Sequence, residues 1–236
     1  MEDLYIIASS KPWNRELPDE LKVKTGKNFK LLCSPDELSL ELLEELKPKF
    51  IFFPHWSHYI PKAIFQNFEC VVFHMTDLPF GRGGSPLQNL IAGGIYETQI
   101  TALKCIDELD AGPIYLKHPL SLYGTAEEIY FRASKVVERM VIEIITKTPT
   151  PFKQIGEPTF FIRRNPSQGN LLNAESLEEA FDIIRMLDAD GYPNAFVKVG
   201  NLRFEFSRAS IKADKLLADV RITLVDEKQE TLNDHN

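Results

Sequence analysis

The sequence predicts an α/β protein with a mostly parallel, Rossmann-like sheet, helices on both of its faces and a small β-rich module at the C-terminus. One observation is a series of short apolar runs in the first third of the chain, at 4–8, 29–33, 50–53 and 70–73. Another is the helical spacing of leucines between the second and third runs. Such alternation is typical of a parallel sheet buried between helices. A third is the change to closely spaced strand signals near the C-terminus.

The middle of the chain continues this pattern with its own start and stop signals. A short helix is expected over 61–65, and another over 86–92, where a proline occupies the first turn and Gly93-Gly94 ends the apolar pattern. The alternation over 98–106 predicts a long strand, with which 113–117 can pair.

A long helix is expected next. Thr125-Ala126-Glu127-Glu128 forms a capping box, and apolar residues then follow one stripe to about Thr146. The run Thr148-Pro149-Thr150-Pro151 ends this helix, because proline cannot continue the hydrogen-bond pattern. We therefore predict a first domain over residues 1–150.

Beyond residue 150 the composition changes. Residues 151–174 contain proline, asparagine and glycine with few apolar runs, and they are interpreted as an extended connector. A second capping box starts at Ser176 and predicts a helix to about Leu187. Three strands are expected after it, over 195–199, 202–206 and 216–224, the first two joined by a Gly200-Asn201 hairpin. Residues 175–236 are the predicted helix-plus-β module.

The composition of the 236-residue chain indicates an ordinary globular protein, because 44% of its residues are apolar and 26% are charged. No apolar run approaches the roughly 18 residues that span a bilayer. The start Met1-Glu2-Asp3 lacks the basic segment of a signal peptide, so a cytoplasmic location and no membrane partner are expected.

Cys33, Cys70 and Cys105 lie in apolar runs and are expected to be buried, reduced thiols. Their spacing predicts no metal site.

One histidine stands at the end of a predicted strand. His74 ends the apolar run 70–73 and precedes an irregular, Gly-rich stretch to Pro86. Ligands bind at the carboxyl ends of strands in open α/β sheets, and an imidazole there is suited to proton transfer. The alternative is a histidine that caps the strand by bonding a backbone carbonyl.

Two motifs around this histidine carry a family resemblance. The first is His74-Met75-Thr76-Asp77-Leu78-Pro79, followed by Arg82-Gly83 and Pro86, and the second is Asp107-Glu108-Leu109-Asp110-Ala111-Gly112. They resemble the signatures of enzymes that use 10-formyltetrahydrofolate as formyl donor, Asn-x-His-x-Ser-x-Leu-Pro with Arg-Gly and proline, then an acidic loop ending in Asp-Thr-Gly or Asp-Ala-Gly. Further on, Tyr192-Pro193-Asn194-Ala195-Phe196 is similar to the Tyr-Pro-Gly-Ala-Phe element in the C-terminal module of methionyl-tRNA and sugar formyltransferases.

The resemblance implies a one-carbon group transferase in which an amine attacks the formyl carbon of the folate. His74 would accept the proton of the amine, since an imidazole takes and returns protons near pH 7. Asp110 would hold His74 in its working tautomer and stabilise the imidazolium. A turn aspartate before Gly112 is the alternative interpretation of Asp110.

One position departs from the family pattern. The Asn two residues before the histidine, which donates to the developing oxyanion, falls on Val72. Loss of one such donor typically costs about a hundredfold or more in rate. Either another donor replaces it, for which His55 is the candidate, or the protein is slow or inactive. His55 is equally compatible with a loop residue stacked on Trp56.

The resemblance also implies where the folate binds, mainly through backbone groups of irregular loops. The implied binding residues are His58, Tyr59, Ile60, Thr76, Asp77, Leu78, Pro79, Ile106, Asp107, Glu108 and Leu109. Phe80, Arg82 and Gly83 are expected on the acceptor side, where Gly81-Arg82-Gly83-Gly84 does not fit a phosphate-loop motif. Arg82 either binds an anionic acceptor group or forms a structural ion pair.

The charge of the chain is used to choose between the formyl acceptors of the family, tRNA and an amino sugar. The net charge is −7, and from Pro151 onward 11 Lys and Arg face 14 Asp and Glu. A module that binds tRNA is not expected to be acidic, so nucleic acid is an unlikely partner. Asp110-Ala111-Gly112-Pro113 is also closer to the sugar enzymes. The expected substrate is therefore the amino group of a nucleotide-linked amino sugar, such as a 4-amino-4,6-dideoxy sugar.

Three alternatives stay open. They are methionyl-tRNA formylation, glycinamide ribonucleotide formylation and a non-catalytic protein that binds folate or a nucleotide sugar. Exposed edges of the C-terminal strands make a homodimer possible.

Overall fold

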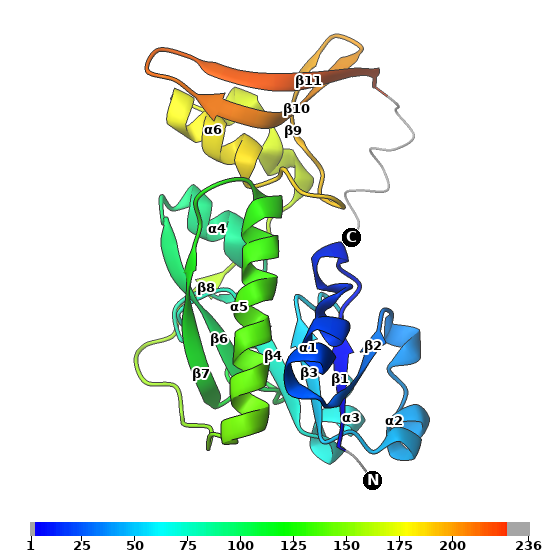
Figure 1. The fold of residues 1–236 in the computed structure, drawn as a ribbon. Helices are drawn as coiled ribbons and strands as arrows, with labels where there is room; N and C mark the ends of the chain where they lie inside the picture. Colours follow the sequence, from blue (N-terminus) through cyan, green and yellow to red (C-terminus); the bar gives the residue numbers. More distant parts are fainter. Residues whose placement is uncertain (1–2, 226–236) are drawn as a thin grey trace. The chain divides into compact units, whose positions relative to one another are not determined.

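A computed structural model describes residues 3–225 of the chain (Figure 1). Its main feature is a six-stranded sheet of order β2-β1-β3-β4-β6-β7. The strands are β1 (Leu4–Ala8), β2 (Asn28–Leu32), β3 (Phe50–Pro54), β4 (Cys70–His74), β6 (Glu97–Lys104) and β7 (Ile114–Ser121). The first four are parallel, and β6 and β7 add to β4 in antiparallel pairs. The predicted α/β fold with a mostly parallel sheet is confirmed.

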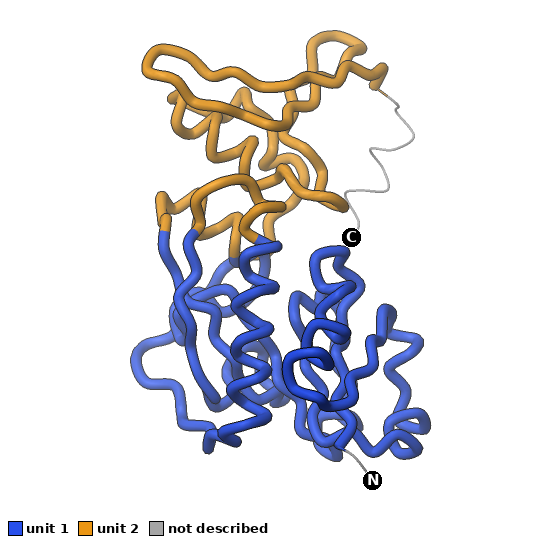
Figure 2. Tube along the Cα trace, viewed as in Figure 1, with its two compact units in different colours: residues 1–86, 97–121, 130–161 blue, residues 87–96, 122–129, 162–236 orange. Residues whose placement is uncertain are grey.

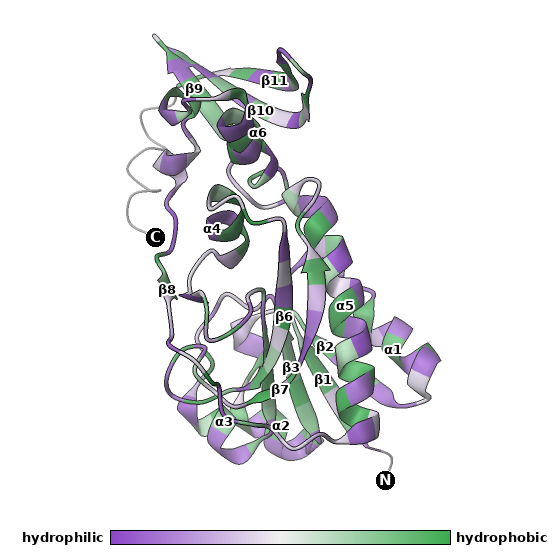
Figure 3. Ribbon diagram, turned by 90° about the vertical axis from the view of Figure 1, so that its left-hand side faces the viewer, coloured by the Kyte–Doolittle hydropathy of each residue, from purple (hydrophilic) through white to green (hydrophobic). Residues whose placement is uncertain are grey.

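Helices lie on both faces of this sheet, with α2 (Leu40–Leu46) and α3 (Lys62–Asn67) on one face and α1 (Leu17–Thr25) and α5 (Ala126–Lys147) on the other (Figure 3). Helices α4 (Pro86–Ala92) and α6 (Leu177–Arg185) belong to a second compact unit. Helices α1 and α5 lie side by side, joined by an ion pair of 2.8 Å between Lys24 and Glu138 (Figure 1). Short 3-10 turns occupy 12–14, 35–37, 166–169 and 171–173.

Alternation along the central strands divides the core into two layers. Ile6 and Ile51 point to the face that α2 and α3 cover through Leu43 and Ile64. Their chain neighbours are equally buried, with Tyr5 and Phe52 fully inaccessible on the opposite face. The central strands are accordingly in the hydrophobic colour of Figure 3, whereas α5 alternates between the two colours. This burial on both faces is what a parallel sheet requires.

The chain forms two compact units (Figure 2). As far as they are described, residues 1–86, 97–121 and 130–161 form the first unit, and residues 87–96, 122–129 and 162–236 form the second. The predicted domain boundaries after residues 150 and 174 stay a prediction. The first part of the predicted connector, however, pairs within unit 1. Strand β8 (Phe160–Phe161) lies parallel to β5 (Arg82–Gly83), and Phe152 bridges to Ile114.

The second unit contains the three-stranded antiparallel sheet β11-β10-β9, as the sequence predicted. The strands are β9 (Ala195–Val199), β10 (Leu202–Ile211) and β11 (Leu216–Leu224), and α6 packs against β10. β9 and β10 meet in the expected hairpin, where Val199 pairs with Leu202.

The cysteines are free in the structure, but their burial differs from the prediction. Cys70 is buried, Cys105 is half-buried and Cys33 is exposed, because the run that contains Cys33 leaves the sheet after Leu32. Burial raises the pKa of the Cys105 thiol to about 11. In the described part of the chain, no helix combines the length and apolar character that crossing a membrane would need.

A buried arginine holds the second unit together. Arg185, at the end of α6, is 2% exposed. Its Nη1 donates to the carbonyls of Leu122 at 2.6 Å and Gly124 at 3.1 Å, and its guanidinium lies 5.5 Å from the ring centre of Tyr96. The side chain thereby joins the turn before α5 to α6.

Replacing Arg185 by Met should therefore destabilise unit 2 by about 3–5 kcal/mol, because two carbonyls and Asp182 lose a charged partner in a buried setting. Thermal and urea unfolding would measure the loss. Arg208→Ala is the control, since Arg208 is exposed and pairs with Asp219 at the surface, where ion pairs contribute about 0–1 kcal/mol. Equal stability of the Arg185→Met and wild-type proteins would contradict this role.

Candidate active site

The site is built on the carboxyl end of β4. His74 is the last residue of this strand and pairs in register with Thr101 of β6. The Thr101 hydroxyl donates to the carbonyl of Thr76 at 2.7 Å and accepts the N–H of Leu78 at 3.4 Å. Both contacts are buried, so the first turn of the loop after His74 is held against the sheet.

The His74 imidazole is 7% exposed and lies between two oxygen atoms. Its Nε2 lies 2.8 Å from the carbonyl oxygen of Gly81. A carbonyl only accepts hydrogen bonds, so Nε2 carries the hydrogen and the lone pair of the neutral ring is on Nδ1. That Nδ1 lies 3.6 Å from Oδ2 of Asp110, whose side chain is 8% exposed. The structure thus brings together the two residues that the sequence motifs singled out.

The division of roles differs from the expectation in one respect. Asp110 was expected to hold the tautomer of His74, but the Gly81 carbonyl does so. The Asp110 carboxylate faces the unprotonated nitrogen instead. A negative charge at that place favours the imidazolium that forms when Nδ1 takes up a proton. The geometry therefore suits a proton acceptor. The backbone-carbonyl contact expected of a histidine that only caps the strand is also present, to Gly81.

Asp110 reaches this position through an unusual backbone. Its φ is +53°, in the left-handed region, and its Oδ2 accepts the N–H of Gly83 at 3.0 Å. Two residues later, a Cβ on Gly112 would lie 1.8 Å from the carbonyl oxygen of Lys104. Only glycine allows the loop to cross the end of β6 this closely.

An ion pair joins the predicted folate-binding segment 106–109 to the first residue of α3, two positions after the predicted segment 58–60. Nζ of Lys62 lies 2.8 Å from Oδ2 of Asp107. Tyr59, Ile106 and Leu109 expose large apolar side chains, whereas Ile60 is buried in the hydrophobic core. The His58 ring lies 5.2 Å from that of Trp56.

The third predicted segment, 76–79, is mostly held inward. Thr76 and Leu78 are fully buried, and the Thr76 carbonyl and the Leu78 N–H are both bonded to the Thr101 hydroxyl. Asp77 is exposed and pairs with Lys117 at 2.5 Å. The Pro79 carbonyl accepts the N–H of Thr159 at 3.2 Å.

The residues expected on the acceptor side lie next to this segment. Phe80 is partly exposed and its ring lies 5.4 Å from that of Phe161. Nη1 of Arg82 lies 3.0 Å from Oε1 of Glu108, a contact of the structural ion-pair type. Gly83 donates to Asp110. Substrate contacts of these residues stay a prediction.

The structure places His55 in a different group of side chains from His74. Its ring lies 5.1 Å from Trp13 and 4.5 Å from Tyr130 of α5, not stacked on Trp56 as one interpretation suggested. Burial, with a smaller effect of Lys11, lowers the pKa of His55 to about 3. Val72 packs against Leu78, so no donor stands at the position of the family Asn. A donor role of His55 stays a prediction.

Thr101, Thr159 and Gln154 help to hold this site and were not predicted. Gln154, in the predicted connector, bonds to both Asp110 and Arg82. No local pattern marks it, because its partners are more than forty positions away along the chain.

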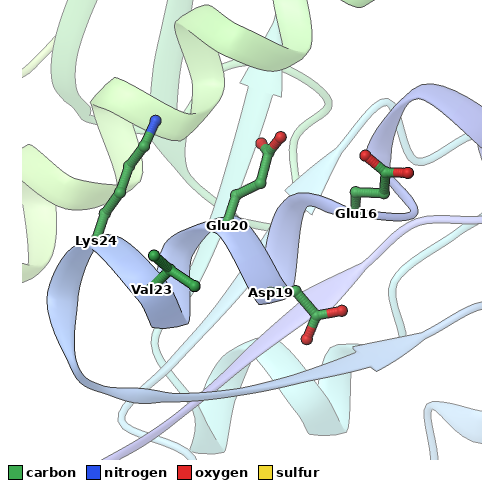
Figure 4. Close-up of a pocket in the computed structure, with 5 residues that line it drawn as sticks. All are labelled: Glu16, Asp19, Glu20, Val23 and Lys24. Atoms are coloured by element: carbon green, nitrogen blue, oxygen red, sulfur yellow. The ribbon is translucent and has the colours of Figure 1, made fainter.

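A surface hollow along α1 is separate from these residues (Figure 4). It is lined by Glu16, Asp19, Glu20, Val23 and Lys24. Glu20 and Lys24 form ion pairs with Lys135 and Glu138 of α5, so the side chains here join two helices. Within residues 3–225, no cluster of three or more His, Cys, Asp or Glu side chains has the arrangement of a metal site.

Comparison with known proteins identifies the family. The family model described as "Methionyl-tRNA formyltransferase, C-terminal domain" matches residues 166–223 of this chain. A solved structure, the methionyl-tRNA formyltransferase from Clostridium thermocellum, is 51% identical, with a TM-score of 0.92, and the match covers 94% of this chain and 100% of that one. This chain belongs to the formyltransferase family. The resemblance that the sequence motifs indicated is confirmed.

Relatives within the formyltransferase family differ in how closely they match. The methionyl-tRNA formyltransferase of Thermodesulfovibrio yellowstonii is 28% identical over 65% of this chain and 54% of its own length. The chain thus spans about half the length of the curated relatives it matches. A sugar N-formyltransferase from Shewanella sp FDAARGOS_354 is 13% identical with a TM-score of 0.68, covering 90% of this chain and 99% of its own, and it shares the fold alone.

These findings correct two expectations. The preference for a nucleotide-linked amino sugar is wrong, because the relatives with substantial identity are methionyl-tRNA formyltransferases. The expectation that nucleic acid is an unlikely partner is wrong for the same reason. Net charge was a poor guide, because phosphate contacts depend on where the charges lie and not on their sum.

The buried His55 leads to a pH prediction. Between about pH 3 and 6.5 the unfolded chain binds a proton at His55 that the native protein does not, so the free energy of unfolding falls as the pH is lowered through this range. From pH 7 to pH 5, wild type should lose about 1–2 kcal/mol more than His55→Phe. Urea unfolding at both pH values measures this difference. Equal losses in the two proteins would show that His55 titrates normally.

Proposed function

We propose that this chain transfers the formyl group of 10-formyltetrahydrofolate to the amino group of methionyl-tRNA. The observation that carries this proposal is the buried pair of His74 Nδ1 and Asp110 Oδ2, 3.6 Å apart, in a chain 51% identical to the Clostridium thermocellum protein of that name. Such a pair at a strand end suits proton transfer. Since charged tRNA is found where translation takes place, the proposed location is the cytoplasm.

The reaction requires one proton to leave the amine and one to reach the folate. The amine nitrogen attacks the formyl carbon, a new C–N bond forms and negative charge develops on the formyl oxygen. The bond between that carbon and N10 of the folate then breaks, and N10 takes a proton. His74, with its lone pair on Nδ1, accepts the proton of the amine, and Asp110 stabilises the resulting imidazolium.

Two features of the segments around this pair support a folate site. A pterin needs backbone donors and acceptors within an apolar slot. The loop 76–79 would form a rigid wall of such a slot, because the Thr76 carbonyl and the Leu78 N–H are both bonded to Thr101. Ile106 and Leu109 expose apolar surface on a segment that the Lys62–Asp107 ion pair holds.

A local basic face supports a tRNA partner despite the negative total charge. On one face of the C-terminal sheet, Lys198 pairs in register with Arg203, and Arg221 lies opposite Glu205. The Arg203 guanidinium lies 3.8 Å from the ring centre of Phe196, and Glu205 contacts both arginines, at 3.1 and 3.3 Å. Positioned guanidinium groups of this kind suit phosphate contacts.

Removing either member of the central pair should abolish most of the activity. We expect His74→Ala and Asp110→Asn each to lower kcat by about 10²–10⁴-fold, the usual contribution of a positioned proton acceptor. Transfer of labelled formyl from 10-formyltetrahydrofolate to methionyl-tRNA is the assay. His118→Ala is the control, because His118 pairs with Glu143 of α5 and not with Asp110. A fully active His74→Ala protein, or a wild type that formylates no methionyl-tRNA, would refute the proposal.

The basic face should contribute electrostatic binding. Lys198→Ala and Arg203→Ala should each weaken methionyl-tRNA binding and reduce the slope of log K against log salt by about one. Filter binding at several KCl concentrations measures the slope, and unchanged thermal midpoints show that Phe196 stays packed. Lys22→Ala, on an exposed position of α1, is the control. Slopes identical to that of wild type would exclude this face from the tRNA site.

A further inference from the structure

Gln154 occupies the centre of a hydrogen-bond network beside the His74–Asp110 pair. Its Nε2 donates to the carbonyls of Asp110 at 2.8 Å and Gly112 at 2.9 Å. Its Oε1 accepts from Arg82, from Nε at 3.3 Å and Nη2 at 2.9 Å. Both amide hydrogens and both acceptor positions of the side chain are therefore used.

The chemistry of the partners requires a side chain of this type. The two carbonyls only accept hydrogen bonds, and the guanidinium only donates them, so the orientation of the amide is determined. A glutamate at this position would keep the contact with Arg82 but would have no donor for Asp110 and Gly112. An aliphatic side chain of similar size would satisfy neither side.

The network acts on the part of the backbone that presents the Asp110 carboxylate. Asp110 has a left-handed φ of +53°, a conformation that non-glycine residues rarely adopt without support. Gln154 binds the carbonyl of this residue, and Arg82 directly precedes Gly83, whose N–H binds the Asp110 carboxylate at 3.0 Å. Gln154 thus holds the main chain of Asp110 directly. Through Arg82 it is also connected to Gly83, which holds the side chain of Asp110.

We propose that Gln154 is a positioning residue that sets the Asp110 carboxylate against Nδ1 of His74. It touches neither the imidazole nor the carboxylate, and it acts through the Asp110 and Gly112 carbonyls and through Arg82. A role of Gln154 in the reaction rests on the proposed formyl transfer. Its role in placing the Asp110 carboxylate is independent of the proposed function.

The segment that carries Gln154 has anchors of its own. Phe152 exchanges two backbone hydrogen bonds with Ile114, of 2.7 and 2.9 Å. The Thr159 hydroxyl accepts the N–H of Gly81 at 2.7 Å, and β8 pairs with β5 beyond it. A substitution at Gln154 therefore leaves the segment attached at both ends, and we expect the variants to fold.

The test compares Gln154→Leu and Gln154→Glu with Lys153→Ala, a change at the exposed neighbouring position. The first readout is hydrogen exchange of the Gly83 amide by NMR, because its bond to the Asp110 carboxylate reports whether that group is in place. We expect exchange at Gly83 to accelerate about tenfold in both Gln154 variants, with the amides of β1 unchanged. The second readout is formyl transfer, in which kcat should fall about tenfold while the KM for 10-formyltetrahydrofolate is kept. The control should behave as wild type in both.

Several results would overturn the proposal. They are unchanged Gly83 exchange in both variants, exchange that accelerates equally in β1, or a KM that rises with kcat constant. Full activity in Gln154→Glu would also overturn it, because this variant keeps the contact with Arg82 but has no donor for the Asp110 and Gly112 carbonyls. If wild type fails to formylate methionyl-tRNA, the proposed function is wrong, and Gly83 exchange still decides the role of Gln154.

Discussion

The arrangement of the site depends on the close approach of one carboxylate to one imidazole. Asp110 Oδ2 lies 3.6 Å from His74 Nδ1, and both side chains are more than nine-tenths buried, where solvent screens the interaction little. A buried carboxylate must be stabilised by donors, and the Gly83 N–H supplies one at 3.0 Å. The approach also requires the loop to cross the end of β6, which it does at Gly112, where a side chain would collide with the Lys104 carbonyl.

The segment after α5 completes the site and does not merely link two parts of the chain. Its β-bridge to Ile114 and its pairing with β5 bring Gln154 and Thr159 to the loops on which Asp110 and Gly81 lie. The Gly81 carbonyl, whose loop this segment holds, determines the tautomer of His74. The loop of Gly81, the loop of Asp110 and the segment with Gln154 and Thr159 therefore act together. They keep the lone pair on His74 Nδ1 facing the carboxylate of Asp110.

Much of the fold could be predicted because short-range patterns specify it. The strands follow from apolar runs, α4 and α5 follow from a proline and a capping box, and the hairpin at Gly200 follows from its turn signal. Helix α1 was not predicted, because it buries few side chains and exposes Val23, so its apolar periodicity is weak. The choice of acceptor was wrong, as the methionyl-tRNA formyltransferase relatives show, because a summed charge contains no information on where charged residues lie in the fold.

By itself, the sequence determined the fold class, the family and the two motif residues His74 and Asp110, since each is encoded in neighbouring residues. Only the tertiary structure decided how these two meet: that Gly81 and not Asp110 holds the tautomer, that His55 joins Trp13 and Tyr130, and that Gln154 binds the Asp110 loop. The physical reason is that a hydrogen bond or a ring contact requires atoms within a few ångströms. Residues far apart in the chain reach that range only when the sheet, its register and the crossing at Gly112 are in place.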